Sequence, residues 1–402
     1  MNEIGIKPEI IRHGKFKAAI EPFMLTEMSP ENREQTEILL NDVWNTILKD
    51  ISVARNLSID SLNTIANDII LSMLPAKPVE VGLIDGLMYP DEFKALLAKK
   101  INKEDIDDIS LISMLDLKER KNNKSNNKIA IIYAEGDING DQKNIHSGYT
   151  KTIKKVLKDD DIDAVVFRVN SPGGSALISD EILSQMKLSK KDKPIVVSMG
   201  NYAASGGYYI SCAADKIIAS PNTITGSIGV FGLFFTAEEL LTRKMKLHFD
   251  NVKTNKFSNL GELHRSLSNE EKALIQISVK NTYNEFISHV SQARNISTEE
   301  VDLIGQGRVW TGLRAEQIGL VDSIGGLQDA IKIAGKLANI ETFTVVEFPQ
   351  MKDGIEAIFS DLVHAKTFEE KTFEEIQIAI FKEKFLNKQG IQALLPIKYD
   401  IN

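Results

Sequence analysis

The sequence predicts an α/β fold, in which strands buried in a parallel sheet alternate with helices. Five runs rich in apolar and β-branched residues are expected to be strands: residues 129–133, 164–169, 195–198, 216–219 and 228–231. Near-continuous apolar runs are typical of strands that are covered on both faces. Residues 179–190 have apolar side chains at helical spacing between two of these strands. Such βαβ units predict helices layered on a parallel sheet.

Size and composition limit what the protein can be. The chain has 402 residues, of which 43% are hydrophobic, so two or three domains with sizeable cores are expected. A net charge of −8 argues against a nucleic-acid-binding protein, whose surface would be basic. The single cysteine, Cys212, excludes an internal disulfide. The six histidines lack metal-ligand spacing, and neither a metal nor another cofactor is expected.

Hydropathy gives no membrane segment. The sequence contains no run of about 18 apolar residues, the length that a transmembrane helix needs. The start of the chain lacks the long apolar core of a signal peptide.

Two parts of the chain are copies of one module. Four landmarks occur twice in the same order: 13–17 and 254–258, 43–45 and 282–284, 54–56 and 293–295, and 82–85 and 319–322. Matching order and spacing indicate a duplication. Only the second copy has a long front half, at about residues 128–250, so we expect a shortened first copy, either a fragment or a natural product.

The two copies give the expected domains. Residues 1–117 would form the carboxyl-terminal part of the first repeat, 118–128 a polar linker, 129–345 the complete second repeat, and 346–402 an irregular, partly helical tail. A helix is expected over residues 29–56, because it opens with a serine cap followed by a proline in the first turn.

A turn of small residues after the third strand candidate contains a serine. Residues 203–207 read Ala-Ala-Ser-Gly-Gly and follow the apolar run 194–199. Small neighbours let a substrate backbone approach Ser205, and glycine adopts the dihedral angles of a sharp turn. The motif fits a nucleophilic serine, and equally a tight structural turn in which the serine is incidental.

A second glycine turn, Asn170-Ser-Pro-Gly-Gly-Ser175, follows the second strand candidate. Backbone N–H groups of Gly173 or Gly174, with that of Gly206, could hold a developing oxyanion beside Ser205. Open α/β sheets place their sites at the carboxyl ends of strands, where both turns lie. A plain Pro-Gly-Gly turn is the alternative. A phosphate loop is disfavoured, because no GxGxxG or Gly-Lys-Ser/Thr pattern is present.

A nucleophilic serine needs a base, and no histidine lies in a motif that recommends it. Lys17 lies among apolar and small residues, and a desolvated lysine can serve as the base of a serine–lysine dyad. Its counterpart in the second copy is Ser258, so the duplication would have divided the catalytic work between the copies. Lys15 is the second choice, and an ordinary surface lysine is the alternative reading.

The chain resembles the signal peptide peptidase A (protease IV) family in its long, tandem-repeat form. The segments that carry the resemblance are 170–175, Tyr202-Ala-Ala-Ser-Gly-Gly-Tyr208, Thr225-Gly-Ser-Ile-Gly-Val-Phe231 and Gly307-Arg-Val-Trp-Thr-Gly312. It covers most of residues 8–345, and more loosely the ending 390–396. The resemblance implies a crotonase-like, Clp-protease-related βαβ superhelix, with one complete copy preceded by the helical remnant of another.

The resemblance also assigns roles to residues. It places the nucleophile on Ser205, the oxyanion glycine in the Gly173–Gly174 pair and the base on Lys17. The short, single-copy form has its lysine where this chain has Ser258, which agrees with a base at Lys17.

The implied function is that of a serine endopeptidase that hydrolyses cleaved signal peptides and other small or unfolded apolar peptides through an acyl-enzyme. The implied assembly is a homo-oligomeric ring, with a tetramer as the expected size. The implied location is the extracytoplasmic (periplasmic) side of the cell membrane, reached through an amino-terminal anchor that this sequence lacks. Two alternatives stay open: a crotonase-like acyl-CoA enzyme, and a truncated, inactive pseudopeptidase that acts in assembly.

Overall fold

A computed structural model describes residues 2–68, 73–103, 112, 125–141, 144–189, 193–349 and 390–394. The chain divides into two compact units. Unit 1 contains residues 1–40 and 125–402, and unit 2 contains residues 41–124. The first 40 residues therefore pack with the second repeat, although the repeats would assign them to the first. The reason is that residues 7–13 pair as a strand with residues 230–236.

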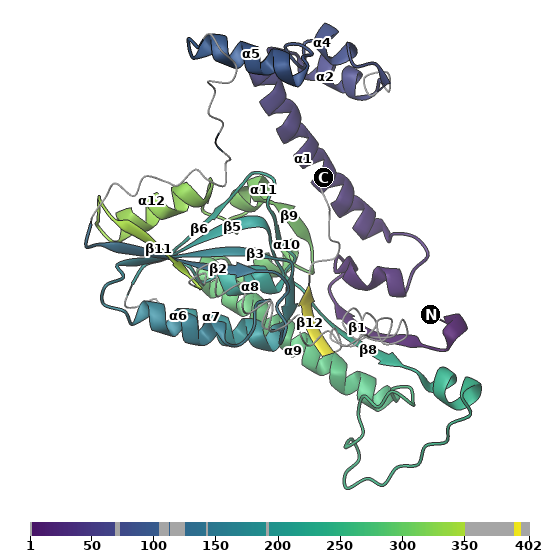
Figure 1. The fold of residues 1–402 in the computed structure, drawn as a ribbon. Coiled ribbons are helices and arrows are strands. Elements are labelled where there is room, and N and C mark those ends of the chain that lie inside the picture. The colour runs from purple at the N-terminus through teal and green to yellow at the C-terminus, as the bar shows by residue number, and fades with distance from the viewer. Residues whose placement is uncertain are drawn as a thin grey trace, which may run out of the picture. The chain divides into compact units, whose positions relative to one another are not determined.

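The larger sheet of unit 1 is built mostly from parallel strands (Figure 1). Its central order is β10-β6-β5-β3-β2-β11, and β7 pairs with β5 on one side and β9 on the other. The strands are β2 (Lys128–Glu135), β3 (Ala164–Ser171), β5 (Ile195–Ala204), β6 (Lys216–Ala219), β7 (Ile224–Gly226), β9 (Val309–Thr311), β10 (Ser323–Ile324) and β11 (Thr344–Phe348). The predicted parallel sheet is thus present.

Helices cover both faces of this sheet (Figure 1). They are α6 (Tyr149–Leu157), α7 (Ala176–Ser189), α8 (Gly206–Ser211), α9 (Asn269–Arg294), α10 (Thr298–Ile304), α11 (Gly312–Gln317) and α12 (Leu327–Leu337). Along β2, Ile129 and Ile131 belong to the core under α12, whereas Ala130 and Ile132 belong to the larger core on the opposite face. Because both faces are buried, the strand sequences are almost continuously apolar.

A second sheet joins the start of the chain to the second repeat. Its order is β1-β8-β12-β4, formed by β1 (Lys7–His13), β8 (Val230–Thr236), β12 (Gly390–Leu394) and β4 (Gly173–Ser175). β1 pairs antiparallel with β8 from Lys7 opposite Thr236 to His13 opposite Val230. This pairing explains why the first residues fold with unit 1. The short helices η1 (Asn2–Ile4) and η2 (Ala18–Phe23) flank β1.

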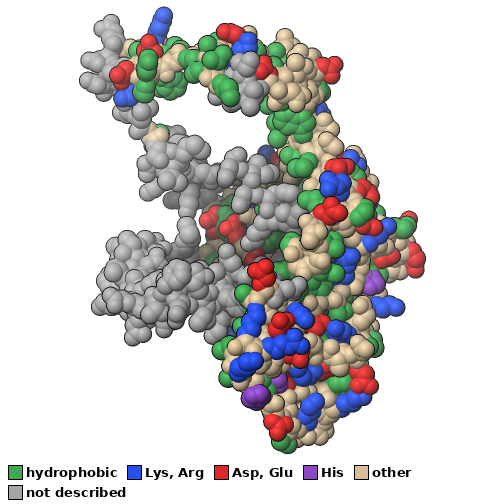
Figure 2. All heavy atoms as spheres, turned by 90° about the vertical axis from the view of Figure 1, so that its right-hand side faces the viewer, with side chains coloured by type: hydrophobic (Ala, Val, Ile, Leu, Met, Phe, Trp, Pro, Cys, Tyr) green, Lys and Arg blue, Asp and Glu red, His purple; other side chains and the backbone are tan. Residues whose placement is uncertain are grey.

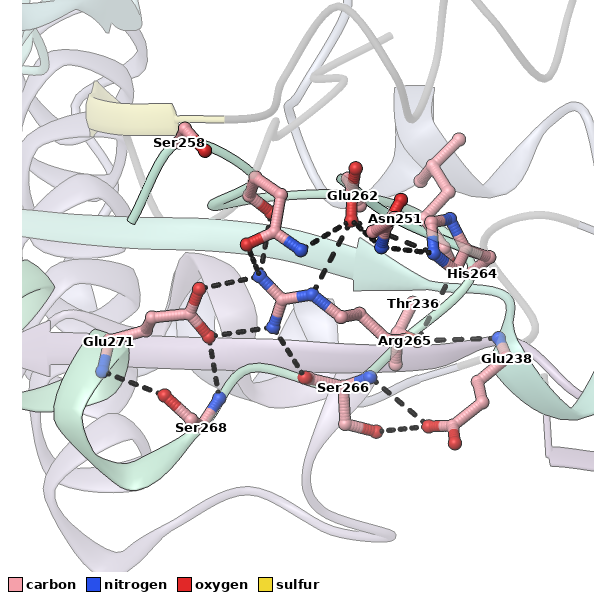
Figure 3. A network of polar contacts seen from close by, with 12 residues as sticks. Thr236, Glu238, Asn251, Ser258, Glu262, His264, Arg265, Ser266, Ser268 and Glu271 are labelled. Atoms are coloured by element: carbon pink, nitrogen blue, oxygen red, sulfur yellow. Dashed lines mark hydrogen bonds and ion pairs between the residues drawn. The ribbon is translucent and has the colours of Figure 1, made fainter. Parts of the chain in front are cut away.

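The connection from β8 to α9 is held by one arginine (Figure 3). It includes η5 (Glu239–Lys244), a π-helix. Arg265 donates to both carboxylate oxygens of Glu271, at 2.6 and 2.8 Å, and to the backbone carbonyl of Asn259 at 2.6 Å. Glu271 also accepts from the backbone N–H of Ser268 at 2.8 Å, in the capping box of α9. The arginine thus fixes the connection to the start of α9.

Unit 2 contains helices α2 (Ile59–Ala66), α4 (Lys77–Glu80) and α5 (Pro90–Lys100), together with the second part of α1 (Pro30–Arg55). Helix α1 begins within the predicted range, and the Ser29 hydroxyl accepts from the N–H of Asn32 at 3.1 Å, as a cap does. Large apolar side chains are exposed over this unit (Figure 2). They include Leu74, Leu87, Met88, Tyr89 and Phe93.

The two predicted copies share one local arrangement of contacts. Arg55 donates from Nε to the carbonyl of Gly82 at 2.9 Å and forms an ion pair with Asp85. In the second copy, Arg294 contacts the carbonyl of Gly319 at 3.0 Å and forms an ion pair with Asp322. The helices that end at these arginines, α1 and α9, each contain 26 residues. The two copies therefore share a local structure as well as a sequence.

The carboxyl-terminal part differs from the expected irregular tail where it is described. Residues 344–348 form β11, which pairs in parallel with β2, and residues 390–394 form β12. Residues 350–389 and 395–402 lie outside the described part, as do residues 118–124 of the expected linker. Among the described helices, none has the length and hydropathy to span a bilayer.

Candidate active site

Ser205 lies between the end of β5 and the start of α8. Its backbone has φ 57° and ψ −116°, a left-handed conformation that is costly for a residue with a Cβ atom and is a mark of functional sites. The Ser205 N–H donates to the carbonyl of Gly226 at 2.8 Å, and the Ser205 carbonyl accepts from Tyr209 at 2.8 Å. These bonds hold the strained serine at the carboxyl end of the strand.

Glycine is required next to this turn. A Cβ atom at Gly207 would lie 2.5 Å from the carbonyl oxygen of Ser171 in β3. Glycine therefore lets α8 approach the sheet closely. The sequence placed residues 203–204 in the turn, whereas β5 continues to Ala204 and the turn is confined to Ser205.

Lys17 reaches Ser205 from the segment after β1. Its side chain is fully buried, at 0% exposure. Its Nζ lies 2.7 Å from Ser205 Oγ, 3.0 Å from Ser227 Oγ and 3.2 Å from the carbonyl oxygen of Ser227. The pairing of β1 with β8 and a bond from the N–H of Phe16 to the carbonyl of Gln306 hold this segment. The structure thus brings the two predicted residues into direct contact.

Two glycines make room for the lysine. A Cβ atom at Gly307 would lie 2.6 Å from Lys17 Cβ, and one at Gly229 would lie 3.3 Å from Lys17 Cδ. Gly307 also has a φ of +85°, which favours glycine. The lysine side chain therefore passes through a close-fitting channel of backbone atoms.

Burial changes the protonation of this lysine. Because the amine is removed from water, the pKa of Lys17 is well below its ordinary value. A carboxylate would oppose this shift, but the three Nζ contacts given above are all to uncharged oxygens. An uncharged amine has two N–H donors and one lone pair, which suits three oxygen neighbours of which one is a hydroxyl donor.

The glycine turn lies at the same sheet edge as the serine. Gly173 and Gly174 have φ of 102° and 153°, and Ser171, just before them, pairs with Ala203, just before the Ser205 turn. The N–H of Gly173 donates to Ser171 Oγ at 3.2 Å. A Cβ atom at Gly174 would lie 2.0 Å from the carbonyl oxygen of Ile138, so only glycine fits. Gly206 is the first residue of α8.

One residue of this site was not singled out in the sequence. Ser227 has a φ of 50° and contributes both its hydroxyl and its carbonyl to the surroundings of Lys17. Its hydroxyl donates in turn to the carbonyl of Gly307 at 3.2 Å. In the sequence, Ser227 lies between Gly226 and Gly229. This glycine-containing segment, Thr225-Gly-Ser-Ile-Gly229, is the pattern that could have pointed to it.

The other candidates lie elsewhere. Lys15, the second choice for the base, is exposed, and its Nζ lies 5.3 Å from the centre of the Phe16 ring. Ser258, the repeat counterpart of Lys17, is exposed in the connection of Figure 3. Cys212 is buried, as expected for a packing residue, and burial raises the pKa of its thiol to about 12. Within the described residues, no group of three or more histidine, cysteine or acidic side chains could hold a metal.

One family profile and several curated relatives match this chain. The profile of Peptidase family S49 matches residues 1–104 and 187–341, more than half of the chain. Protease 4 of Haemophilus influenzae is 34% identical over 363 residues, which are 86% of this chain and 59% of that protein. The chloroplastic serine protease SPPA of Arabidopsis thaliana is 31% identical over 90% of this chain and 55% of that protein. The chain thus spans less than two thirds of the length of these relatives.

A membrane-bound stomatin-specific protease in complex with a substrate peptide has a TM-score of 0.37 and 15% identity, with 58% of this chain and 98% of that one covered. On the profile match and the long curated alignments, the chain belongs to peptidase family S49, a family of serine proteases.

Proposed function

We propose that this protein is a serine endopeptidase in which Ser205 is the nucleophile and Lys17 is the general base. The observation that carries the proposal is the 2.7 Å contact between Lys17 Nζ and Ser205 Oγ in a fully buried setting. A charged lysine cannot accept a proton, but burial lowers the pKa of Lys17 and favours the neutral amine.

The hydrogen-bond geometry suits this role. The two oxygens of Ser227 accept the two N–H groups of a neutral amine. The hydroxyl of Ser227 is free to accept, because it donates its own hydrogen to Gly307. The amine lone pair is then directed at the hydroxyl of Ser205, as base catalysis requires.

Acylation and deacylation then follow the usual order for a serine nucleophile. Lys17 takes the proton of Ser205 as Oγ bonds to the scissile carbonyl carbon. The resulting ammonium gives that proton to the amide nitrogen as the C–N bond breaks, and the amine product leaves. Lys17 next removes a proton from water, which attacks the ester, and the proton returns to Ser205 as the acid product leaves.

The developing oxyanion would be held by backbone N–H groups. Gly206 follows the nucleophile directly, and Gly173 and Gly174 lie at the same sheet edge. The N–H of Gly173 would have to leave the hydroxyl of Ser171 to reach an oxyanion. Loss of one such donor costs about 3 kcal/mol of barrier in comparable enzymes. The family resemblance likewise implies an oxyanion glycine in the Gly173–Gly174 pair.

The proposed substrates are extended, apolar peptides such as cleaved signal peptides. An extended peptide can pair as a strand with the edge of β4 that β12 occupies in this structure. We also propose a homo-oligomeric ring at the extracytoplasmic side of a membrane, as the family resemblance implies. The exposed apolar side chains of unit 2 are compatible with contacts between subunits (Figure 2).

The peptidase is favoured over both alternatives. An acyl-CoA enzyme would have no use for a strained serine that contacts a buried, neutral lysine. A pseudopeptidase would not need to keep the amine in contact with the hydroxyl, which costs burial of a polar group.

The test is active-site labelling followed by peptide hydrolysis. A fluorophosphonate probe should label the wild-type chain at Ser205, located by peptide mass spectrometry, and should fail with Ser205→Ala. The matched control is Ser211→Ala, a buried serine six residues later that donates to the carbonyl of Gly207. Labelling of Ser205→Ala at the wild-type rate, or none of the wild type beside a labelled serine protease standard, would contradict the proposal.

A further inference from the structure

Residues 305–308, which lie between α10 and β9, hold the segment that carries the proposed base. The carbonyl of Gln306 accepts from the N–H of Phe16 at 3.0 Å. Because Phe16 directly precedes Lys17, this bond fixes the backbone from which the amine extends. A Cβ atom at Gly14 would lie 2.4 Å from the same carbonyl oxygen, so the two segments are in close contact.

The same four residues also hold Ser227. The carbonyl of Gly307 accepts from the Ser227 hydroxyl at 3.2 Å, and the carbonyl of Arg308 accepts from the Ser227 N–H at 2.7 Å. Both oxygens of Ser227 contact the amine of Lys17. A shift of residues 305–308 would therefore disturb the lysine and the serine that orients it.

Two side chains outside the site fix the position of Gln306. The hydroxyl of Tyr283, in α9, accepts from the N–H of Gln306 at 3.2 Å and donates to Asp302 Oδ1 at 2.5 Å. The other carboxylate oxygen of Asp302, in α10, accepts from the side-chain amide of Gln306 at 3.2 Å. Gln306 has a φ of 54°, which is uncommon for a residue with a Cβ atom. The three bonds therefore stabilise a backbone conformation that is otherwise costly.

Tyr283 is well placed for this task. Its side chain is 1% exposed, and its ring packs against that of His13, the last residue of β1, with 4.2 Å between the ring centres. Burial, together with the bond to Asp302, raises the pKa of Tyr283, so the hydroxyl keeps its proton and donates it to the carboxylate.

The predicted first copy has a different pair at the equivalent positions. Trp44 and Asn63 are 19 residues apart, as are Tyr283 and Asp302. Nε1 of Trp44 donates to Asn63 Oδ1 at 2.9 Å. An indole N–H is a donor only, so Trp44 cannot accept from a backbone N–H as Tyr283 does. The accepting hydroxyl thus occurs in the copy whose residues 305–308 contact the segment of the base.

We propose that Tyr283 and Asp302 are positioning residues for the general base, and that they act through residues 305–308. This inference rests on the proposed peptidase function. The two side chains hold the segment, and the segment holds Lys17 and Ser227. Their hydrogen bonds should therefore affect the chemical step rather than the binding of peptide.

The first experiment removes one hydroxyl. Tyr283→Phe keeps the ring that packs against His13 but loses the donor and the acceptor. With an apolar fluorogenic peptide, kcat per folded molecule should fall about tenfold and KM should not change, as expected for one or two neutral hydrogen bonds. The matched control is Tyr133→Phe, whose phenol donates to Glu347 at 2.9 Å, and it should keep wild-type kcat. Equal kcat values in the two variants would overturn the inference.

The pH profile gives a readout that a purely structural role would not change. If residues 305–308 loosen, water reaches the amine and the pKa of Lys17 rises towards its ordinary value. The acid limb of kcat/KM should then lie about one pH unit higher in Tyr283→Phe than in wild type. An unchanged limb would show that Lys17 keeps its surroundings, and would contradict the positioning role.

Two variants of Asp302 test the hydrogen bonds themselves. In Asp302→Asn, the amide oxygen can accept from Tyr283, and the amide N–H can donate to Gln306 once the Gln306 amide has rotated. Asp302→Ala loses both bonds. We expect Asp302→Asn to keep most of the wild-type kcat and Asp302→Ala to lose about tenfold or more. Equal losses in the two variants would contradict a role through these bonds.

A titration of Lys17 separates this inference from the proposed function. In the Ser205→Ala background, the carbon-13 resonance of Lys17 Cε reports protonation without turnover, and its absence in Lys17→Met assigns it. The resonance should titrate at higher pH when Tyr283 is replaced by phenylalanine. If no variant hydrolysed peptide, the peptidase would be excluded, and this titration would still decide the positioning role. Equal titration with and without Tyr283→Phe would overturn the positioning role and leave the peptidase.

Discussion

The side-chain nitrogen of Lys17 lies 2.7 Å from the hydroxyl oxygen of Ser205, although 188 residues separate the two in the sequence. The lysine lies in the predicted first copy of the module and the serine in the predicted second copy. The pairing of β1 with β8 joins the copies at this point. A contact of this kind needs both copies, so the site is a property of the pair.

Replacement of Lys17 by methionine should abolish turnover and leave the fold intact. Methionine fills a similar volume but cannot accept a proton, and loss of a general base typically costs 10²–10⁴-fold. Lys17→Arg should also be inactive, because a guanidinium stays charged. Steady-state kinetics with an uncharged peptide should show the loss in kcat. Lys15→Ala is the control and should keep wild-type kcat; equal losses in both variants would argue against a specific base.

The buried amine also predicts an unusual dependence of stability on pH. The folded pKa of Lys17 is depressed, so between that value and about 10.4 the unfolded chain binds the extra proton. The free energy of unfolding should therefore rise with pH in this window, by up to about 1.4 kcal/mol per pH unit. Urea unfolding at pH 7, 8 and 9 should show wild type gaining stability relative to Lys17→Met. A constant difference would mean that the amine titrates alike in both states.

The rate of hydrolysis should depend on the same amine, because only its neutral form can act as the base. Hydrolysis should fall as pH drops through the folded pKa of Lys17, because protonation removes the base. That limb should lie well below the ordinary lysine range. A profile of kcat/KM from pH 5 to pH 10 measures it, and a limb near pH 10.5 would contradict a desolvated base.

Replacement of Ser227 by alanine should weaken catalysis without removing it. The variant loses one of the two oxygens that orient the amine, at 3.0 Å, but keeps the backbone carbonyl at 3.2 Å. A neutral hydrogen bond is worth about 1 kcal/mol, so kcat should fall roughly five- to tenfold. Ser227→Thr should retain more activity than Ser227→Ala if the hydroxyl matters. A kcat of Ser227→Ala equal to wild type would show that the carbonyl alone orients Lys17.

The buried sheet could be predicted from sequence because its signal is local. β2, β3, β5 and β6 are covered on both faces, and their apolar runs report this directly. The end of β5 could not be predicted, since its last residues pair with β7, from Tyr202 opposite Ile224 onward. Such a pairing depends on a partner about twenty residues away rather than on local composition.

The second sheet could not be predicted, because its strands depend on partners that are distant in the sequence. β1 is half-exposed along most of its length and is a strand because β8 lies beside it. Ser205 and Lys17 could still be named, because small residues around a serine and apolar residues around a lysine are local signals. Ser227 lies in a glycine-containing segment, but its contact with Lys17 joins segments 210 residues apart and could not be predicted from that segment alone.

Replacement of Gly307 by alanine should disturb both stability and activity. The new methyl group would lie 2.6 Å from Lys17 Cβ, and the residue would have to keep a φ of +85°. Together these effects should cost about 2–4 kcal/mol in the free energy of unfolding. Activity should fall further than stability explains, because the lysine itself is displaced. The matched control is Gly86→Ala in unit 2, where a Cβ atom meets no described atom within 4 Å. Equal effects of the two substitutions would contradict a packing role for Gly307.

The Arg265–Glu271 pair predicts a loss of stability in acid. Hydrogen bonds from Arg265 and from Ser268 hold the pKa of Glu271 at about 2, against an ordinary value near 4.3. Because the folded pKa is depressed, the stability from this carboxylate is complete above about pH 5 and is lost as pH falls towards 2. Arg265→Ala should cost about 3 kcal/mol at pH 7, since it leaves Glu271 buried without its cation.

The same pair gives a control within the site. In Glu271→Gln, the side chain cannot ionise, so the stability difference from wild type should shrink as pH falls from 5 to 2. Thermal unfolding in low-salt buffers across this range measures the difference. If the difference stayed constant with pH, the carboxylate would titrate alike in the folded and unfolded chains. The connection between β8 and α9 would then be stabilised by its other contacts, such as the hydrogen bonds of Ser266 with Glu238 (Figure 3).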